Sequence, residues 1–203
     1  MSINVEYNNK EINQIVMENV LKMLERRKLI KSWEDEMKKL GDNLTTKTSF
    51  TIQLSDKSNY GIYLINAKLT SIVQGTPLDE YLSNNIDIHK IIIARDVAKK
   101  VVKQIVGEYK NAEFFFESEM MEDIPSKTFI PEHQLLSTEE KEELFNKFSE
   151  TELSKIFLTE MMSRYYNAKI NDVFRIIRPS PTAGMNIIYR RVVNSSWDIL
   201  FDV

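Results

Sequence analysis

The pattern of apolar and polar positions divides this chain into stretches with different periodicity. Between residues 11 and 31, apolar side chains recur every three to four positions with charged ones between them, which predicts an amphipathic helix. Residues 33–40 predict a second, short helix that ends at Gly41. Residues 48–54 and 60–65 are rich in β-branched and aromatic side chains, and they predict two strands joined by a polar turn.

The next stretch alternates helices and strands. Thr76, followed by a proline, predicts the start of a short helix, and residues 89–94 and 112–116 predict two strands. Asp96 is expected to cap a helix between these strands, and Gly107 is expected to end it. The strand–helix–strand order predicts an α/β sheet with partly parallel pairing, covered on both faces.

From residue 124 the pattern changes to that of a small α+β domain. Ser137 and Glu140 have the spacing of a capping box and predict the start of a helix that runs to about Phe148. Residues 152–166 predict a further helix. Residues 173–178 and 187–192 predict two strands, joined by a loop rich in proline and glycine.

The last ten residues have a pattern of their own. Between residues 197 and 203, apolar and polar positions alternate with a period of two, which predicts a strand with one buried face. This strand could extend the chain's own sheet or add to a neighbouring subunit, and a disordered end is the third possibility. We therefore expect three segments: an α/β domain at 1–123, an α+β domain at 124–193 and a strand-like tail at 194–203.

Composition narrows the classes of protein. The chain has 203 residues, of which 42% are hydrophobic and 28% are charged, and its formal net charge is −3. This is enough apolar material for one or two packed cores. The chain has no cysteine, which excludes a disulfide scaffold, a cysteine-ligated zinc site and a thiol nucleophile. The polar start and the lack of a long apolar run predict an intracellular protein with no membrane partner.

The residues offer little catalytic chemistry. His89 and His133 fall in different predicted domains, so neither is expected to bind a metal. Glu36 and Lys38, and likewise Glu139 with Lys141, have the E-x-K spacing of metal-dependent nucleases, but they fall on predicted helices without the upstream carboxylate. The few glycines are too scattered for a phosphate-binding loop. We expect no catalytic residue, no cofactor and no metal.

One segment differs in charge from the rest of the chain. Residues 155–193 contain seven basic and two acidic residues, an excess of five positive charges in a protein with a net charge of −3. These charges could be the solvated faces of two strands. They could instead form a basic surface that docks an acidic partner or lies near nucleic acid.

The same segment contains a recognisable motif. Residues 173–189, VFRIIRPSPTAGMNIIY, resemble the R-P-S-E-T-A-G signature of the fifth, shared small subunit of eukaryotic RNA polymerases, whose C-terminal part is similar to a shorter archaeal polymerase subunit. Upstream, Ser163-Arg164-Tyr165-Tyr166 resembles the family's A-R-Y-F/L segment, and residues 129–133 resemble its L-V-P-E-H segment. The three motifs occur in the family's order over residues 126–193.

The chain also departs from the family pattern. Asn167 and Asn171 replace two glycines, and asparagine is the residue that best tolerates the left-handed conformation a glycine would supply. Pro181 replaces the glutamate of the signature, and Met185 replaces the arginine that follows Gly184. These two changes remove polar groups that could have contacted a polymerase partner. The divergence and the AT-rich composition favour a large DNA virus as the source, and a fast-evolving protist would give the same pattern.

The resemblance implies a structural role in transcription. It implies a jaw-like N-terminal domain, similar in fold to restriction endonucleases and lying near downstream duplex DNA. Because the N-terminal residues show no strong basic stripe, we expect any DNA contact to be weak or indirect. It also implies a C-terminal assembly domain that docks on the largest polymerase subunit, while the active site lies in other chains. By this resemblance, the partner-binding residues are predicted to be Arg164, Tyr165, Arg178, Ser180, Thr182 and Gly184.

Two further functions stay open from the sequence. A metal-dependent nuclease could be built on the N-terminal α/β domain, and a free protein-binding adaptor could use the basic C-terminal face. The polymerase interpretation implies a location in the virion and host cytoplasm for a viral protein, or in the nucleus for a cellular one.

Overall fold

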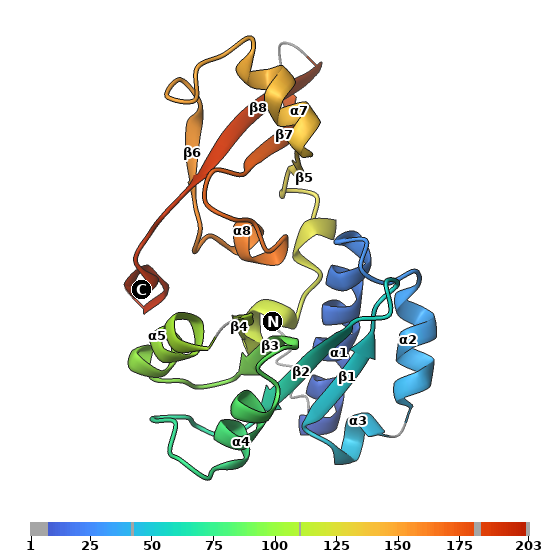
Figure 1. The fold of residues 1–203 in the computed structure, drawn as a ribbon. Coiled ribbons are helices and arrows are strands. Elements are labelled where there is room, and N and C mark those ends of the chain that lie inside the picture. Colours follow the sequence, from blue (N-terminus) through green and yellow to red (C-terminus); the bar gives the residue numbers. More distant parts are fainter. Residues whose placement is uncertain (1–7, 42, 110, 181–183, 202–203) are drawn as a thin grey trace, which may run out of the picture. The chain divides into compact units, whose positions relative to one another are not determined.

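The computed structural model describes residues 8–41, 43–109, 111–180 and 184–201. The chain divides into two compact units, one ending at Asp123 and the other beginning at Ile124. Each unit contains one four-stranded sheet with helices packed around it (Figure 1). The mixed α/β content predicted from the sequence is therefore confirmed, with one sheet in each unit.

The N-terminal unit is built on the sheet order β1-β2-β3-β4. Strand β1 is antiparallel to β2, whereas β2, β3 and β4 are parallel to one another, which confirms the partly parallel pairing. The elements follow in the order α1 (Asn9–Arg26), α2 (Trp33–Leu40), α3 (Asn43–Thr46), β1 (Ser49–Gln53), β2 (Asn59–Ile65), α4 (Pro77–Asn84), β3 (His89–Ala94), α5 (Lys99–Glu108), β4 (Ala112–Phe116) and α6 (Glu117–Met120).

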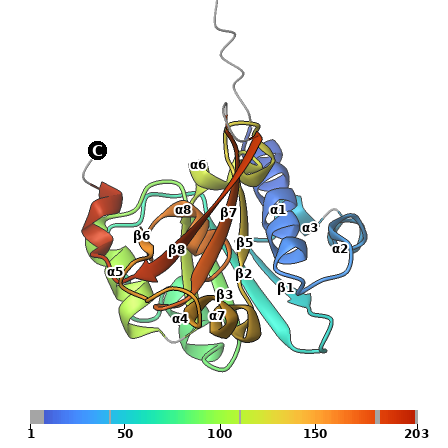
Figure 2. The ribbon, with the colours of Figure 1, turned by 90° about the horizontal axis from the view of Figure 1, so that it is seen from above.

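Helices cover both faces of this sheet. The parallel connections through α4 and α5 advance in the same direction across the sheet, so right-handed crossovers place both helices on one face. Helix α1 lies on the other side, as Figure 2 shows. Its buried positions include Met17, Leu21 and Leu24, each 0% exposed. Burial from both sides explains why residues 91–94 of β3 are entirely apolar and buried.

The C-terminal unit has the sheet order β5-β7-β8-β6. Strands β5 and β7 are antiparallel, as are β7 and β8, and the edge strand β6 runs parallel to β8. Its elements are η1 (Ile124–Ser126), β5 (Glu132–Leu135), α7 (Thr138–Phe145), β6 (Ser154–Phe157), α8 (Met161–Tyr165), β7 (Val173–Ser180), β8 (Gly184–Val193) and η2 (Trp197–Phe201). The capping box of Ser137 and Glu140 at the start of α7 is present as predicted.

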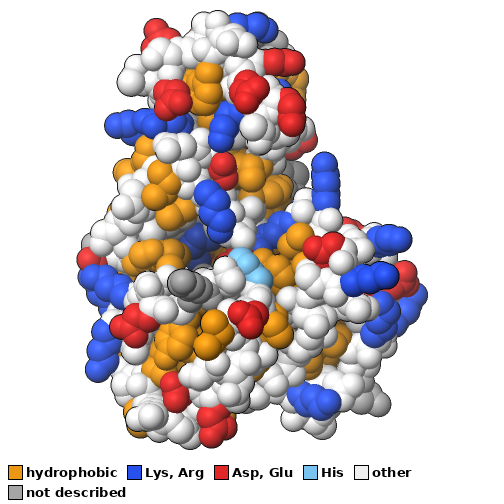
Figure 3. Space-filling view, viewed as in Figure 1, with side chains coloured by type: hydrophobic (Ala, Val, Ile, Leu, Met, Phe, Trp, Pro, Cys, Tyr) orange, Lys and Arg blue, Asp and Glu red, His pale blue; other side chains and the backbone are white. Residues whose placement is uncertain are grey.

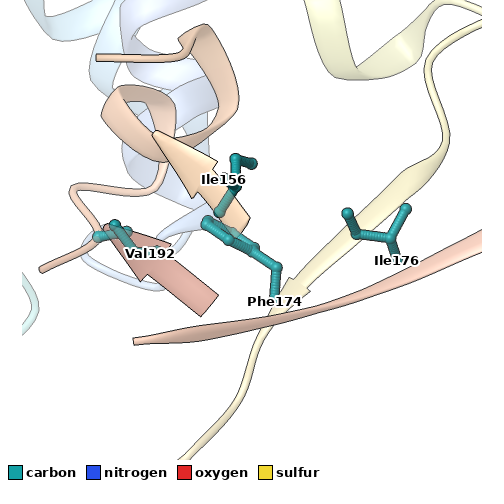
Figure 4. Packing of buried hydrophobic residues seen from close by; sticks show 5 residues of the cluster. Ile156, Phe174, Ile176 and Val192 are labelled. Carbon is teal, nitrogen blue, oxygen red and sulfur yellow. The ribbon is translucent and has the colours of Figure 1, made fainter. Parts of the chain in front are cut away.

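The two faces of this sheet pack against different clusters. On one face Phe174, Ile176 and Val192 pack with Ile156 of β6, and Figure 4 shows the Phe174 ring reaching toward Ile156. On the opposite face Val173 packs with apolar residues of α7 and its flanking loops. The alternation of side chains along β7 therefore places neighbouring residues in separate small cores.

The predicted helix at residues 152–166 is wrong in its first half. Residues 154–157 form the strand β6, and a helix begins only at Met161. The strand forms because Ile156 pairs with Val192 of β8 and is buried there. This long-range pairing outweighs the helical spacing of the local sequence.

The predicted strand in the tail is also wrong. Residues 197–201 form the short 3₁₀ helix η2, and residues 202 and 203 lie outside the described part of the chain. Both sides of β8 are already occupied, one by β7 and the other by β6, so the tail finds no free edge beside β8. The hydroxyl of Ser196 accepts a hydrogen bond from the Asp198 backbone N–H, and the Ser196 carbonyl accepts one from Ile199, which favours a helical turn.

The predicted ends of helix α5 are wrong as well. The helix starts at Lys99 after an Ala98 N-cap that makes no side-chain hydrogen bond, and Gly107 lies inside it. Asp96 instead accepts a hydrogen bond from the Leu69 N–H through its carbonyl. Its carboxylate forms an ion pair with Lys68 at 3.1 Å. Asp96 therefore fixes the loop that follows β2, and the helix begins without a side-chain cap.

Candidate functional site

Three of the six predicted contact residues lie on the β7–β8 hairpin. Arg178 and Ser180 stand near the end of β7, and Gly184 begins β8 directly opposite Ser180. Arg178 and Gly184 are exposed, and Ser180 is half-buried. Thr182 lies outside the described residues. The hairpin thus brings the described residues of the signature to one accessible end of the sheet.

Left-handed backbone explains several residues of the motif region. Gly184 has a φ of +71°, and a Cβ built on it would meet no atom of the described residues within 4 Å, so the left-handed backbone favours glycine there. Asn167 and Asn171 have φ values of 50° and 73°. The prediction that these two asparagines adopt the left-handed conformation is confirmed.

The other two predicted contact residues lie inside the chain. Arg164 is 7% exposed and Tyr165 is 3% exposed, both within α8. The ring of Tyr165 packs edge-on against that of Tyr166, which in turn contacts Phe174 of the core. These contacts give Arg164 and Tyr165 a role in the packing of this chain, and their contact with a partner stays a prediction.

Arg164 belongs to a polar network that includes the tail. Its Nε donates a hydrogen bond to the carbonyl of Thr159 over 2.9 Å. The N–H and the hydroxyl of Thr159 lie 3.2 and 2.8 Å from the hydroxyl of Ser195. Through these contacts, Arg164 fixes the loop before α8, and this loop holds the segment that follows β8.

Two of the basic residues in 155–193 pair with acidic residues from outside that segment. Arg175 lies 3.0 Å from Glu140 of α7, and Arg191 lies 3.6 Å from Glu150. The Ser137 backbone N–H lowers the pKa of Glu140, and Arg175 adds to this effect. On the face shown in Figure 3, Lys and Arg side chains are interspersed with Asp and Glu. Two of the seven basic residues of the segment are thus paired with acidic residues, which favours the solvated-strand interpretation over a continuous basic surface.

A buried charge cluster in the N-terminal unit was not predicted from the sequence. Glu113 of β4 accepts hydrogen bonds from both terminal nitrogens of Arg27, at 2.8 and 2.6 Å. Its Oε1 also lies 2.9 Å from the Tyr60 hydroxyl and 2.7 Å from Nε2 of His89. The His89 ring stacks on that of Tyr60 with centroids 4.4 Å apart. The cluster joins the end of α1 to strands β2, β3 and β4.

The charges of this cluster stabilise one another. Burial alone would raise the pKa of the Glu113 carboxyl, but Arg27 and His89 outweigh it and lower the pKa to about 2. Burial also raises the pKa of the Tyr60 hydroxyl. Because Arg27 and its neighbours already occupy both carboxylate oxygens, the cluster has the character of a structural ion pair. The only signal in the sequence is a single glutamate inside an otherwise apolar strand.

The histidines considered as metal ligands make hydrogen bonds to other groups of the chain. Within the described ranges, no group of three or more His, Asp or Glu side chains could hold a metal ion. His133 donates from Nδ1 to the carbonyl of Pro131 at 2.7 Å, and burial lowers the pKa of its imidazole. The E-x-K pairs lie on helices α2 and α7, as predicted. A search of the described helices found none that is long and apolar enough to cross a membrane.

Comparisons with known proteins agree with the motifs. Residues 122–192 match the family model of the C-terminal domain of RNA polymerase Rpb5. The chain is 31% identical over 199 residues to DNA-directed RNA polymerase subunit 5 of Acanthamoeba polyphaga mimivirus, in a match that covers 91% of this chain and 94% of the relative. It is 29% identical over 203 residues to the RNA polymerase I, II and III subunit rpabc1 of Dictyostelium discoideum, in a match that covers 91% of this chain and 100% of the relative.

An archaeal relative matches a shorter stretch. Subunit Rpo5 of Nitrosopumilus maritimus is 36% identical over 72 residues, which is 34% of this chain and 87% of the relative. The matches thus come from small subunits of DNA-directed RNA polymerases in a virus, a eukaryote and an archaeon. The chain belongs to the RNA polymerase subunit 5 (Rpb5) family.

Proposed function

We propose that this chain is a structural, non-catalytic subunit of a multisubunit DNA-directed RNA polymerase whose active site lies in other chains. In this proposal the C-terminal unit docks on the largest polymerase subunit, and the N-terminal unit forms part of the jaw near downstream duplex DNA. The observation that carries the proposal is the 31% identity to a viral polymerase subunit 5 over 91% of the chain. The protein would act wherever its polymerase acts: the virion and host cytoplasm for a viral genome, or the nucleus for a cellular one.

The residues that match the family model support a separate role for each of the two units. The family model begins at residue 122, next to the division between Asp123 and Ile124. This coincidence supports residues 124–193 as the assembly domain, 1–123 as the jaw-like domain and 194–203 as an additional tail. Within the assembly domain, the exposed Arg178 and Gly184 are the described signature residues best placed to meet a partner.

The jaw role rests on the N-terminal sheet. One antiparallel strand followed by three parallel strands, with helices on both faces, supports the restriction-endonuclease-like arrangement that the family resemblance implies. Residues 1–123 contain seventeen Lys and Arg residues against nineteen Asp and Glu residues. Because strong DNA binding needs an excess of positive charge, this balance favours weak or indirect contact with the duplex.

Purification of the tagged full-length chain from its native source tests the proposal. We expect mass spectrometry to identify the two largest polymerase subunits in the same complex. Arg178→Glu should reduce incorporation about tenfold or more, because a charge at the interface is reversed. The control is Lys155→Glu, which makes the same charge change at an exposed position of β6 outside the hairpin. Recovery of the wild-type chain only as a free monomer would refute the proposed function.

A further inference from the structure

The exposed end of the β7–β8 hairpin has two faces of opposite chemistry. In this antiparallel pair, residues directly opposite each other point to the same side of the sheet, and successive residues alternate between sides. On one side, Arg178 stands opposite Asn186, and both are exposed. The other side carries two opposed apolar pairs, which we call the hairpin patch: Ile177 with Ile187, and Pro179 with Met185.

The hairpin patch continues a face that is covered further down the strands. Val173 and Tyr189 alternate in step with the patch, and they pack with Leu144 of α7. Helix α7 has eight residues and is about 12 Å long, whereas the eight residues of β7 extend over about 26 Å. One short helix therefore cannot cover the whole face. Arg175 lies on this face and pairs with Glu140 of α7, and the apolar pairs of the hairpin patch follow toward the end of the hairpin.

The patch is exposed in this chain. Met185 is 59% exposed and Ile187 is 53% exposed, and they are two positions apart on the same strand. Single exposed apolar residues are common on protein surfaces, but a contiguous group on one side of a hairpin end is typical of a protein contact. Within residues 177–180 and 184–187, the charged and polar side chains lie on the opposite side of the sheet from the patch, and Arg175 borders the patch on its own side.

We propose that the hairpin patch binds an apolar surface of the polymerase subunit on which the C-terminal unit docks, and that this contact makes the chain specific for its own polymerase. This inference rests on the proposed function. The patch lies within residues 122–192, the part of the chain that matches the family model. Within the patch, Met185 stands where the family signature has an arginine. A partner surface that pairs with a guanidinium would leave its polar groups unsatisfied against a methionine, so the partner of this chain presents apolar groups at that point.

Competition for incorporation tests this contact directly. Wild-type and variant full-length chains with different tags are co-expressed in the native host, the polymerase is purified through its largest subunit, and the two tags are quantified. Met185→Arg should be incorporated about tenfold less than the wild-type chain, because a guanidinium would be buried against apolar groups. Met185→Leu should stay within about twofold of the wild-type chain, since it conserves the apolar surface and nearly the volume.

A matched control separates the patch from a general effect of added charge. Ile170 is 50% exposed in the same unit but outside the hairpin, and Ile170→Arg should be incorporated like the wild-type chain. Melting temperatures within about 3 °C of wild type for the purified variants would exclude misfolding as the cause of any loss. Equal incorporation of Met185→Arg and wild type would overturn the inference, as would an equal loss for Ile170→Arg.

The same experiment distinguishes the inference from the proposed function. If the wild-type chain itself is missing from the purified polymerase, the proposed function fails. If the wild-type chain is present and Met185→Arg competes with it equally, only the inference fails. Sedimentation of the isolated chain tests a second copy as the occupant: a wild-type dimer that Met185→Arg converts to a monomer would overturn the assignment to a polymerase subunit.

Discussion

Replacing Glu113 by glutamine should destabilise the N-terminal unit strongly at neutral pH. Glu113 and Arg27 are 10% and 4% exposed at their side chains, and both terminal nitrogens of Arg27 bond to the carboxylate. Glutamine keeps the shape of the side chain but removes the negative charge of Glu113, so the buried guanidinium loses its ion pair with this carboxylate. Breaking a buried ion pair in this way costs about 3–5 kcal/mol. Because the new amide would still offer one carbonyl oxygen to Arg27, we expect a loss of about 3 kcal/mol, at the lower end of that range.

The effect should disappear as the solution is acidified. The pKa of Glu113 is lowered from 4.5 to about 2 in the folded chain, and each unit of difference corresponds to about 1.4 kcal/mol. A carboxyl whose pKa is lower in the folded state stabilises the fold above its unfolded pKa, and this contribution is lost as the pH falls toward its folded pKa. Between about pH 5 and pH 2.5 the wild-type chain should therefore lose about 2.4 kcal/mol that Glu113→Gln does not have to lose.

Urea unfolding followed by tryptophan fluorescence measures this difference. The chain has two tryptophans, Trp33 in α2 and Trp197 in η2, so a Trp197→Phe background reports on the N-terminal unit. Glu108→Gln changes an exposed glutamate of α5 and should shift the unfolding free energy by no more than about 0.5 kcal/mol at any pH. If Glu113→Gln and wild type differ by less than about 1 kcal/mol at pH 7, or by the same amount at neutral and acidic pH, the ion-pair account is wrong.

Two substitutions test packing. A Cβ at Gly61 would clash with the Tyr81 hydroxyl, so Gly61→Ala should cost about 1–3 kcal/mol of unfolding free energy despite the better strand propensity of alanine, and Tyr81→Phe should recover most of it in the double variant. Among the described residues the buried Ser163 hydroxyl has no hydrogen-bond partner, so Ser163→Ala should stabilise the C-terminal unit by about 1 kcal/mol in urea unfolding. Unchanged stability of Gly61→Ala, or a less stable Ser163→Ala, would contradict these two assignments.

Local patterns predicted most of the N-terminal unit but failed at one strand of the C-terminal unit. Strands β3 and β4 have the predicted ends, because burial on both faces makes them largely apolar. Residues 154–157 have helical spacing with their neighbours and become a strand only because β8 pairs with them. The missed strand β6 also explains the wrong prediction of a strand in the tail. Without β6, one edge of β8 would be open to the tail, which in the structure forms η2.

The candidate site was predictable in position but not in exposure. The sequence placed Arg178 at the end of a predicted strand and Gly184 in the loop that follows it, and the structure has both at the exposed end of that hairpin. Arg164 and Tyr165 come from an equally recognisable motif, yet their side chains are inside the chain. A sequence motif indicates which residues the family has in common, but it does not indicate whether a side chain faces the core of the chain or a partner. The Glu113 cluster left no motif, since its members lie far apart in the sequence.

Compared with the family pattern, this chain differs between its internal positions and its exposed positions, and this difference bears on how the subunit diverged. Arg164 and Tyr165, which pack inside the chain, are retained, and Asn171 replaces a glycine with a left-handed backbone. Met185, which is exposed, has lost the charge of the signature residue. Changes that preserve internal contacts leave the fold intact, whereas a change at an exposed contact alters only what the surface can bind. The chain therefore keeps the internal contacts of its motifs while the chemistry of one exposed edge has changed, and this is the combination expected of a subunit matched to a divergent polymerase.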